Sequence, residues 1–301
     1  MEADTPAREI LITGATGLVG PPLVRVLRDA GHRVTTLARG DNHAAPSWSP
    51  TRGELRLGDT PLPEVVIHLA GENIAARRWG AAQRRRLVES RETGTRVLIR
   101  GLRQAGARPR LMLFASAVGW YGDRGDEPLD ETAAPGGGVP SEICARLEAA
   151  ADEARSISQR VVPMRVGIVL SPEGGALGRM LLPFRLGLGG RIGHGRQYMS
   201  WIAMADLLAG IRHLVERSSL DGPVNLTAPN PVANAEFVVA LGRALHRPAV
   251  LPMPAFAVRL LFGRMGEELL LAGARVLPER LLSDGYRFAE PAIDGALDRL
   301  L

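Results

Sequence analysis

Short apolar runs alternate with longer amphipathic stretches along most of the chain. The runs at residues 9–13, 65–69 and 110–115 are almost continuously apolar, as expected of strands that are covered on both faces. The full pattern predicts strands at residues 9–13, 33–37, 54–57, 65–69, 110–115, 161–170 and 223–226, and helices at residues 18–30, 83–104, 141–156 and 206–216. Strands and helices that alternate in this way predict an α/β fold with a doubly wound parallel sheet.

The pattern changes after residue 170. Residues 171–200 are rich in glycine, with a dense run at residues 187–195. Such a stretch is longer than a connector between two elements needs to be, and long loops in compact domains are often functional. Helical periodicity returns at about residue 228, with prolines between the segments.

The first expected strand runs into the sequence TGATGLVG at residues 13–20. The first glycine of this motif allows a tight turn, the second lets the backbone approach a pyrophosphate, and the third permits close packing of helix and strand. A strand before the motif and a helix after it are the context that distinguishes a dinucleotide site from a plain turn. We therefore predict that the cofactor contacts include Gly14, Thr16, Gly17, Leu18 and Val19.

The end of the second expected strand bears on the choice of dinucleotide. Arg39 lies 19 residues beyond Gly20, where an arginine suits the 2′-phosphate of NADP and an acidic side chain would suit the ribose of NAD. Asp41 is close enough to keep NAD as the alternative. We expect NADP(H) to be the cofactor.

The basic residues of this 301-residue chain are all arginine, because Lys and Arg total 37 and no Lys occurs in the sequence. Mechanisms that need a lysine amine are excluded, since arginine keeps its proton at any accessible pH. The net charge of +5 would suit an anionic ligand. The one dense basic run, Arg84-Arg85-Arg86, is typical of a solvated helix face, so we expect no nucleic-acid partner.

Cysteine content and hydropathy exclude further classes of protein. A single cysteine, Cys144, excludes an intrachain disulfide framework and a cysteine-based zinc site, and we expect no metal. The first residues lack the pattern of a signal peptide, and no run of about 18 apolar residues occurs. We therefore expect a cytoplasmic protein without a membrane partner.

Further motifs resemble one known family. They are HLAG at residues 68–71, SAVGWYG at residues 116–122, SWI at residues 200–202 and NLTAPNP at residues 225–231. Together with the glycine motif they resemble the extended short-chain dehydrogenase/reductases. The likeness is greatest to the atypical subgroup called the epimerase family, which is NAD-dependent epimerase/dehydratase-like and has a C-terminal domain of unknown function. The resemblance covers nearly the whole chain.

This resemblance implies a Rossmann-type fold in two parts. Residues 1–170, completed by about 203–228, would form the NADP-binding domain, and residues 171–202 and 229–301 a smaller C-terminal substrate-binding subdomain. The substrate would bind outside the carboxyl ends of the strands. The resemblance also places Leu69, Ala70 and Gly71 against the cofactor, and Arg165 and Gly167 near its nicotinamide.

The chain departs from the superfamily at the proton-transfer pair. Superfamily members carry a Tyr and, four residues later, a Lys that lowers the pKa of that Tyr. Here the two positions fall on Pro140 and Cys144, so the pair is absent. Cys144 could act as a weak acid or fill a small apolar site. His68 lies inside an expected buried strand, where we expect a core residue rather than a catalyst.

Three other residues are candidates for catalysis. Ser116 lies next to the position of the superfamily's Ser/Thr and could hydrogen-bond the reacting oxygen, or it could only cap a strand. Tyr121 could act as an acid if the loop 117–127 folds over the nicotinamide, or it could pack within that loop. Glu72 could act as a general base or tie its own loop to Arg78.

The glycine-rich loop supplies candidate substrate contacts. Its glycines expose N–H groups and its arginines offer bidentate contacts to an anion. We therefore predict substrate binding by Arg191, His194, Gln197 and Trp201. The subgroup carries a His where this chain has Ala203, which removes whatever role that His plays.

These observations lead to one main functional hypothesis and two alternatives. The main hypothesis is an NADP-dependent oxidoreductase or epimerase that acts on a carbonyl or secondary alcohol of a small substrate, either anionic or nucleotide-linked. The first alternative is an NADP-binding regulatory or redox-sensing protein without turnover. The second is a non-redox isomerase or cyclase that retains the cofactor. The long helix expected at residues 83–104 offers a surface for a homodimer.

Overall fold

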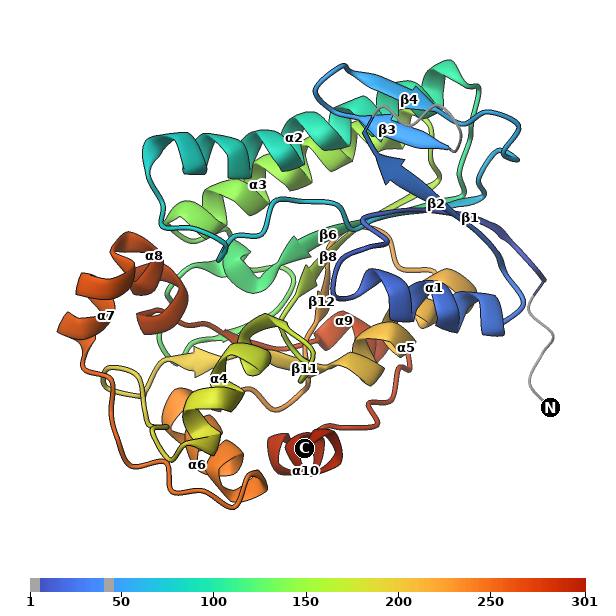
Figure 1. Cartoon of the computed structure of the whole chain (residues 1–301). Coiled ribbons are helices and arrows are strands. Elements are labelled where there is room, and N and C mark those ends of the chain that lie inside the picture. Colours follow the sequence, from blue (N-terminus) through green and yellow to red (C-terminus); the bar gives the residue numbers. More distant parts are fainter. Residues whose placement is uncertain (1–5, 41–45) are drawn as a thin grey trace.

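An eight-stranded sheet forms the centre of the computed structural model, which describes residues 6–40 and 46–301 (Figure 1). The strand order is β12-β8-β6-β5-β1-β2-β3-β4, and every pair is parallel except β3–β4. The strands of this sheet are β1 (Glu9–Thr13), β2 (Arg33–Arg39), β3 (Ser47–Ser49), β4 (Glu54–Arg56), β5 (Val65–His68), β6 (Leu111–Ala117), β8 (Arg160–Val166) and β12 (Val224–Leu226). The expected doubly wound parallel sheet is confirmed.

Helices cover both faces of this sheet (Figure 1). They are α1 (Gly20–Asp29), α5 (Met204–Glu216), α2 (Ala81–Gln104) and α3 (Val139–Asp152). Side chains of β1 point alternately to the two faces, so Ile10 and Ile12 pack in a core with α1 and α5, while Leu11 packs in a core with α2 and α3. The near-continuous apolar strands therefore have the burial that their sequences predict.

A smaller lobe is built beside the sheet. Its elements are β9 (Ile168–Leu170), α4 (Gly175–Arg185), β10 (Tyr198–Met199), β11 (Trp201–Ala203), β13 (Val232–Ala233), α6 (Asn234–Ala244), α7 (Ala255–Phe262), α8 (Arg264–Gly266), η3 (Glu267–Leu271) and α10 (Ile293–Leu300). A separate core, which includes Trp201 and Phe237, joins the helices α4, α6 and α10 to the β9–β11 pair.

The chain passes from the sheet to this lobe at Gly167. The single strand expected over residues 161–170 is divided there into β8 and β9, which belong to different sheets. A Cβ atom at Gly167 would lie 2.7 Å from the carbonyl oxygen of Ser200, which is closer than real Cβ contacts allow. Glycine is therefore required where β8 ends.

The last part of the chain returns to the main sheet. The short helix α9 (Glu279–Ser283) packs against β12, and Leu281 and Tyr286 belong to the core on the α1 and α5 side. A further short pair joins β7 (Pro128–Leu129) to β14 (Arg275–Val276). These segments pack with the large sheet, whereas the sequence led us to place all of residues 229–301 in the smaller lobe.

Two negative findings hold for residues 6–40 and 46–301. No helix in these ranges is both long enough and apolar enough to cross a membrane. Nor do these ranges contain three His, Cys, Asp or Glu residues grouped so that they could hold a metal ion.

Candidate functional site

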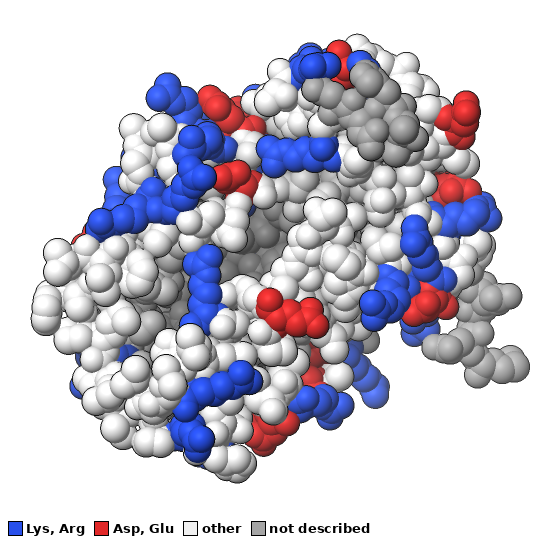
Figure 2. Space-filling view, viewed as in Figure 1, with Lys and Arg blue, Asp and Glu red and all other residues white. Residues whose placement is uncertain are grey.

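A cavity of about 480 Å³ lies at the carboxyl ends of β1, β5, β6 and β8. It is the point where the strand order reverses, because β2 lies on one side of β1 and β5 on the other. Figure 2 shows this face hollowed near its centre, with arginine side chains around the rim. The lining includes most of the predicted cofactor contacts, namely Gly14, Gly17, Leu18, Val19, Leu69, Ala70, Gly71 and Gly167.

The glycine turn between β1 and α1 is held by steric constraints. Gly14 has φ +74°, and a Cβ atom there would lie 2.7 Å from the backbone nitrogen of Ala70. The N–H of Gly17 donates to the carbonyl oxygen of Gly14 at 3.1 Å, which closes the turn. Pro21 and Pro22 have no N–H groups, so anion contacts at this end must come from the turn itself. Thr16 is exposed and does not line the cavity.

A buried contact fixes the loop after β5 against β1. The Thr13 hydroxyl lies 2.7 Å from Nδ1 of His68 and accepts the N–H of Ala70 at 3.3 Å. Burial, assisted by the positive charge of Arg91, lowers the pKa of His68 to about 4. The imidazole is therefore neutral near pH 7 and packs edge-on against Trp48. His68 is a core residue, as expected from its place in the strand.

Ser116 reaches the cavity wall at the end of β6 and is held by a buried ion pair. Its hydroxyl donates to Oε1 of Glu148 at 2.6 Å. Arg165 donates to the same carboxylate through Nε at 3.0 Å and Nη2 at 2.9 Å. A hydroxyl has one proton, so while this bond lasts Ser116 can accept a hydrogen bond from a ligand but cannot donate one. Arg165 itself does not line the cavity, unlike the placement expected beside the nicotinamide.

Tyr121 lies behind this wall rather than in it. Its hydroxyl donates to Oδ1 of Asn225 at 2.7 Å and accepts Nη1 of Arg165 at 3.1 Å. Burial raises the pKa of Tyr121 above its ordinary value, against the opposing effect of Arg165. The ring is fully buried with Leu129. The loop directs Tyr121 into the protein core, and its hydroxyl does not line the cavity. The structure therefore gives no support to the expected proton transfer from Tyr121 to a ligand there.

The positions of the missing Tyr and Lys both face the cavity. Pro140 and Cys144 lie on α3 in its lining. The thiol of Cys144 donates to the carbonyl oxygen of Ala117 at 3.6 Å, and burial raises the pKa of this thiol. It is therefore a neutral, weak donor near pH 7. Glu72 also lines the cavity, half-buried after β5, and so remains placed to act as a base.

Arg39 ends β2 and its side chain is exposed. Within residues 6–40 and 46–301 no hydrogen bond or ion pair involves its guanidinium, which leaves it available to a phosphate. The acidic alternative at this point, Asp41, lies outside the described residues.

The predicted substrate loop does not reach this cavity. Gln197 is buried and donates through Nε2 to the carbonyl oxygens of Ile192 at 3.0 Å and Leu270 at 2.8 Å. Trp201 is fully buried in the core of the smaller lobe. Arg191 and His194 are exposed, but neither lines the cavity. Gln197 and Trp201 therefore serve the packing of the smaller lobe rather than this cavity, whereas substrate binding by Arg191 and His194 stays a prediction.

Several residues of the cavity lining were not predicted from the sequence, and Leu269 and Arg91 are two of them. Leu269, from η3, lines the wall opposite the sheet, and its neighbour Glu268 accepts the N–H of Val139 at 2.5 Å where α3 begins. Arg91, from α2, lines the cavity as well. An apolar residue and an arginine in helical sequence give no local signal of this kind, because only the tertiary fold brings them to the site.

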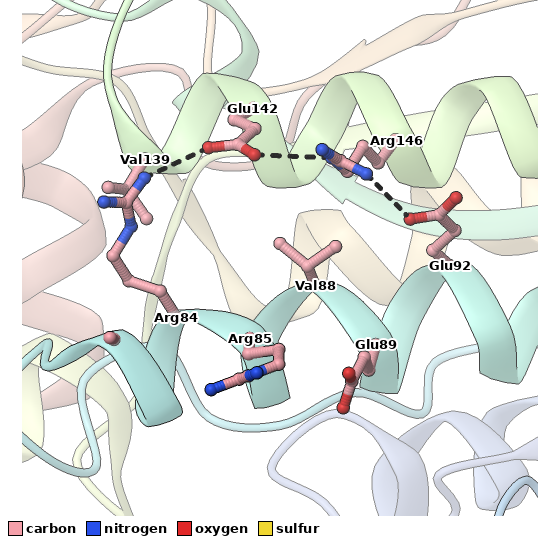
Figure 3. A pocket seen from close by; sticks show the side chains of 9 residues that line it. Arg84, Arg85, Val88, Glu89, Glu92, Val139, Glu142 and Arg146 are labelled. Atoms are coloured by element: carbon pink, nitrogen blue, oxygen red, sulfur yellow. Dashed lines mark hydrogen bonds and ion pairs between the residues drawn. The ribbon is translucent and has the colours of Figure 1, made fainter.

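A second, shallower depression of about 380 Å³ lies between α2 and α3. Figure 3 shows a chain of ion pairs along it, in which Arg84 meets Glu142, Glu142 meets Arg146 and Arg146 meets Glu92. The basic run at Arg84 is thus partly neutralised on a helix face, as its sequence predicts. A homodimer through this helix stays a prediction.

The glycine turn, the reversal of strand order and the adjoining cavity define a Rossmann-type nucleotide-binding protein. The chain belongs to the NAD dependent epimerase/dehydratase family, which matches residues 10–226. A domain of unknown function matches residues 253–300, the region that supplies Leu269.

Known relatives share nearly the full length of the chain. An epimerase family protein of Mycobacterium bovis, Mb2239, is 41% identical over 96% of both chains, and human SDR39U1 is 36% identical over 97% of this chain and 99% of its own. The crystal structure of human SDR39U1 (isoform 2) with NADPH has a TM-score of 0.88 at 33% identity and covers 97% of this chain and 98% of that one. A UDP-glucose 4-epimerase from Thermus thermophilus with NAD, at 22% identity over 97% of both chains and a TM-score of 0.72, shares the fold.

Proposed function

We propose that the cavity binds NADP(H) and that the chain is an NADP-dependent oxidoreductase or epimerase. Its substrate would be a small, anionic or nucleotide-linked molecule with a carbonyl or secondary alcohol. One observation carries the proposal: a single cavity is lined both by the glycine turn and by Ser116, Glu72 and Cys144.

The residues present fit a dinucleotide. The turn leaves no room for a side chain at Gly14, and Leu18 and Val19 line the cavity, where their main-chain N–H groups would meet a pyrophosphate. Arg39 would hold the 2′-phosphate. The presence of NADPH in the human relative supports this choice of cofactor. When bound, the nicotinamide supplies the hydride chemistry.

The chain's own groups would position the substrate and move a proton. Ser116 would accept a hydrogen bond from a substrate hydroxyl, because its own proton is committed to Glu148. Glu72 would take a proton at the mouth of the cavity, the standard role of a carboxylate as general base. Tyr121 has no part in this scheme, because its hydroxyl is engaged behind the wall.

One observation favours a second function, NADP(H) binding without turnover. The hydroxyl of Ser116 and the thiol of Cys144 already donate within the protein, to Glu148 and to Ala117, and Pro140 carries no acid. Among the described residues, no side chain with a proton free to donate therefore lies where the family's Tyr would act. A regulatory or redox-sensing role does not require such a proton donor.

Three measurements separate these functions. Fluorescence titration with NADPH tests binding, and the loss of NADPH absorbance at 340 nm with a panel of aldehydes, ketones and oxo acids tests reduction. Because an epimerase regenerates its nicotinamide and consumes no NADPH, NMR of nucleotide sugars incubated with the NADP⁺-loaded protein tests epimerisation. We expect binding, and turnover that Glu72→Gln lowers about 10²- to 10⁴-fold. Glu89→Gln, an exposed glutamate on α2 outside the cavity, is the matched control and should change nothing.

The outcomes of these measurements distinguish an enzyme from a protein that only binds NADP(H). A protein that does not bind NADPH refutes both functions. A protein that binds NADPH and consumes none with the whole panel is not a reductase of these compounds. The enzymatic proposal is refuted, and binding without turnover is supported, when the NADP⁺-loaded protein also leaves the nucleotide sugars unchanged.

A further inference from the structure

Arg91 is a cation in the wall of the cavity. It projects from α2 toward the loop after β5, where a Cβ atom on Gly71 would lie 3.2 Å from its Cζ. Both residues line the cavity. Because Gly71 has no side chain, nothing from that residue covers the guanidinium, which stays open to whatever the cavity holds.

Within residues 6–40 and 46–301, no carboxylate forms an ion pair with this guanidinium. Its one hydrogen bond within the described residues runs from Nη1 to the carbonyl oxygen of Leu87 at 3.3 Å, one turn earlier on the same helix. A guanidinium has five N–H donors, so most of them have no protein acceptor. By contrast, Arg96, on the same helix, pairs with Glu92 at 2.6 Å and with Glu153 at 2.7 Å.

The surroundings of Arg91 make an unpaired charge costly. Burial lowers the pKa of Arg91, and the nearby Cys144 and Glu72 offset this effect only in part. Neither of these groups lies within ion-pairing distance among the described residues. A buried charge that forms no ion pair destabilises a fold, and an anion that enters the cavity would supply the missing partner.

The contacts proposed for the cofactor leave this charge unused. The pyrophosphate would be served by the main chain around Leu18 and Val19, and the 2′-phosphate by Arg39 at the end of β2. Arg91 lies against Gly71 and close to Cys144, and Cys144 is in turn close to Ser116. An anion held by Arg91 would therefore lie near the reacting groups.

We propose that Arg91 binds the carboxylate of the substrate, which makes the substrate a small oxo acid or hydroxy acid. This inference rests on the proposed function, because it places the carboxylate beside a nicotinamide. A guanidinium can contact both oxygens of a carboxylate at once, which fixes the orientation of the adjoining carbonyl or alcohol as well as adding affinity.

Matched ligands and variants test the proposal on the full chain saturated with NADP⁺. Isothermal titration would compare pyruvate, 2-oxobutanoate and 2-oxoglutarate with the methyl ester of each. Arg91→Leu removes the charge and Arg91→Lys keeps it without the bidentate geometry. Arg85→Leu makes the same change of charge on the exposed side of α2, outside this cavity, and serves as the control. Thermal unfolding confirms that each variant is folded.

The expected result has three parts. At least one acid binds more tightly than its ester, Arg91→Leu weakens the acid about 10- to 100-fold without changing the ester, and Arg91→Lys gives an intermediate loss. NADPH affinity stays unchanged in Arg91→Leu and Arg85→Leu. If wild-type protein fails to bind NADPH, the proposed function fails. If it binds NADPH but no acid is preferred over its ester, or if Arg91→Leu weakens NADPH itself, the assignment of Arg91 is overturned and the cofactor site stands.

Discussion

The buried pair of Arg165 and Glu148 permits a quantitative test of what holds Ser116 in place. The two side chains are 3% and 9% exposed and are joined at 2.9 Å. Removing one partner leaves the other charge buried alone, so we expect Arg165→Met and Glu148→Leu each to lower the free energy of unfolding by about 3–5 kcal/mol.

The double variant should be more stable than either single variant. It leaves no unpaired charge, and the remaining cost is that of lost hydrogen bonds. Tyr121 keeps its bond to Asn225, and Ser116 faces the cavity, where water can replace Glu148. We therefore expect the double variant to lose only about 1–3 kcal/mol relative to wild type.

Urea unfolding followed by circular dichroism at pH 7 would measure these differences. Arg146→Met is the control and lies on α3, the helix that carries Glu148. Arg146 pairs with Glu142 at 3.3 Å, and the two side chains are 51% and 41% exposed. An exposed pair of this kind contributes about 0–1 kcal/mol. A double variant as unstable as the sum of its two single variants would refute the view that unpaired charge dominates the cost.

Three further predictions concern the cofactor site and its support. In Gly14→Ala the alanine would have to adopt a left-handed backbone, which costs about 1–2 kcal/mol, and its Cβ would lie 2.7 Å from the backbone nitrogen of Ala70. The NADPH affinity measured by fluorescence titration should therefore fall at least about 10-fold. Gly31→Ala, at φ +85° with no neighbour within 4 Å, should leave that affinity unchanged, and an equal loss would show that backbone strain alone is responsible. Arg39→Ala should weaken NADPH about 10- to 100-fold but leave NADH unchanged, whereas Arg33→Ala at the start of the same strand should affect neither, and an equal loss for NADH would contradict a 2′-phosphate contact. Because the pKa of His68 falls from 6.5 to about 4 on folding, only the unfolded chain takes up this proton between those pH values, so stability should decrease by about 3 kcal/mol as pH falls through this window. His68→Gln should lack that component of the pH dependence in urea titrations, and an unchanged slope would exclude His68 as its source.

Most of the fold could be predicted from sequence because its signals are local. Continuous apolar runs mark strands buried on both faces, and the spacing at Gly14 fixes the turn that a dinucleotide requires. The division of the strand at Gly167 was not predictable, since the requirement for glycine comes from Ser200, a residue brought there by tertiary folding. The strand β3, with three residues of sequence SWS, has no apolar pattern to detect.

The site was predictable only in part, for the same reason. Ser116, Glu72 and the glycine turn follow directly after strands, and the parallel sheet brings those ends together. The expected contacts at Gln197 and Trp201 fail, because glycine-rich sequence shows that a loop is present without showing what it faces. The helical sequence around Arg91 does not show which residues surround it, and only the structure shows that it forms no ion pair among the described residues.

The return of the C-terminal segment to the sheet has a consequence for biosynthesis. Leu281 and Tyr286 fill the core beneath α5, and Leu269 completes the cavity wall. A nascent chain that has emerged only as far as residue 228 carries every strand of the large sheet but still exposes the apolar surface that these residues cover. The nucleotide site is therefore complete only after residue 286 has been synthesised, and a truncation before that point that spares the whole glycine motif is expected to yield a chain prone to aggregation.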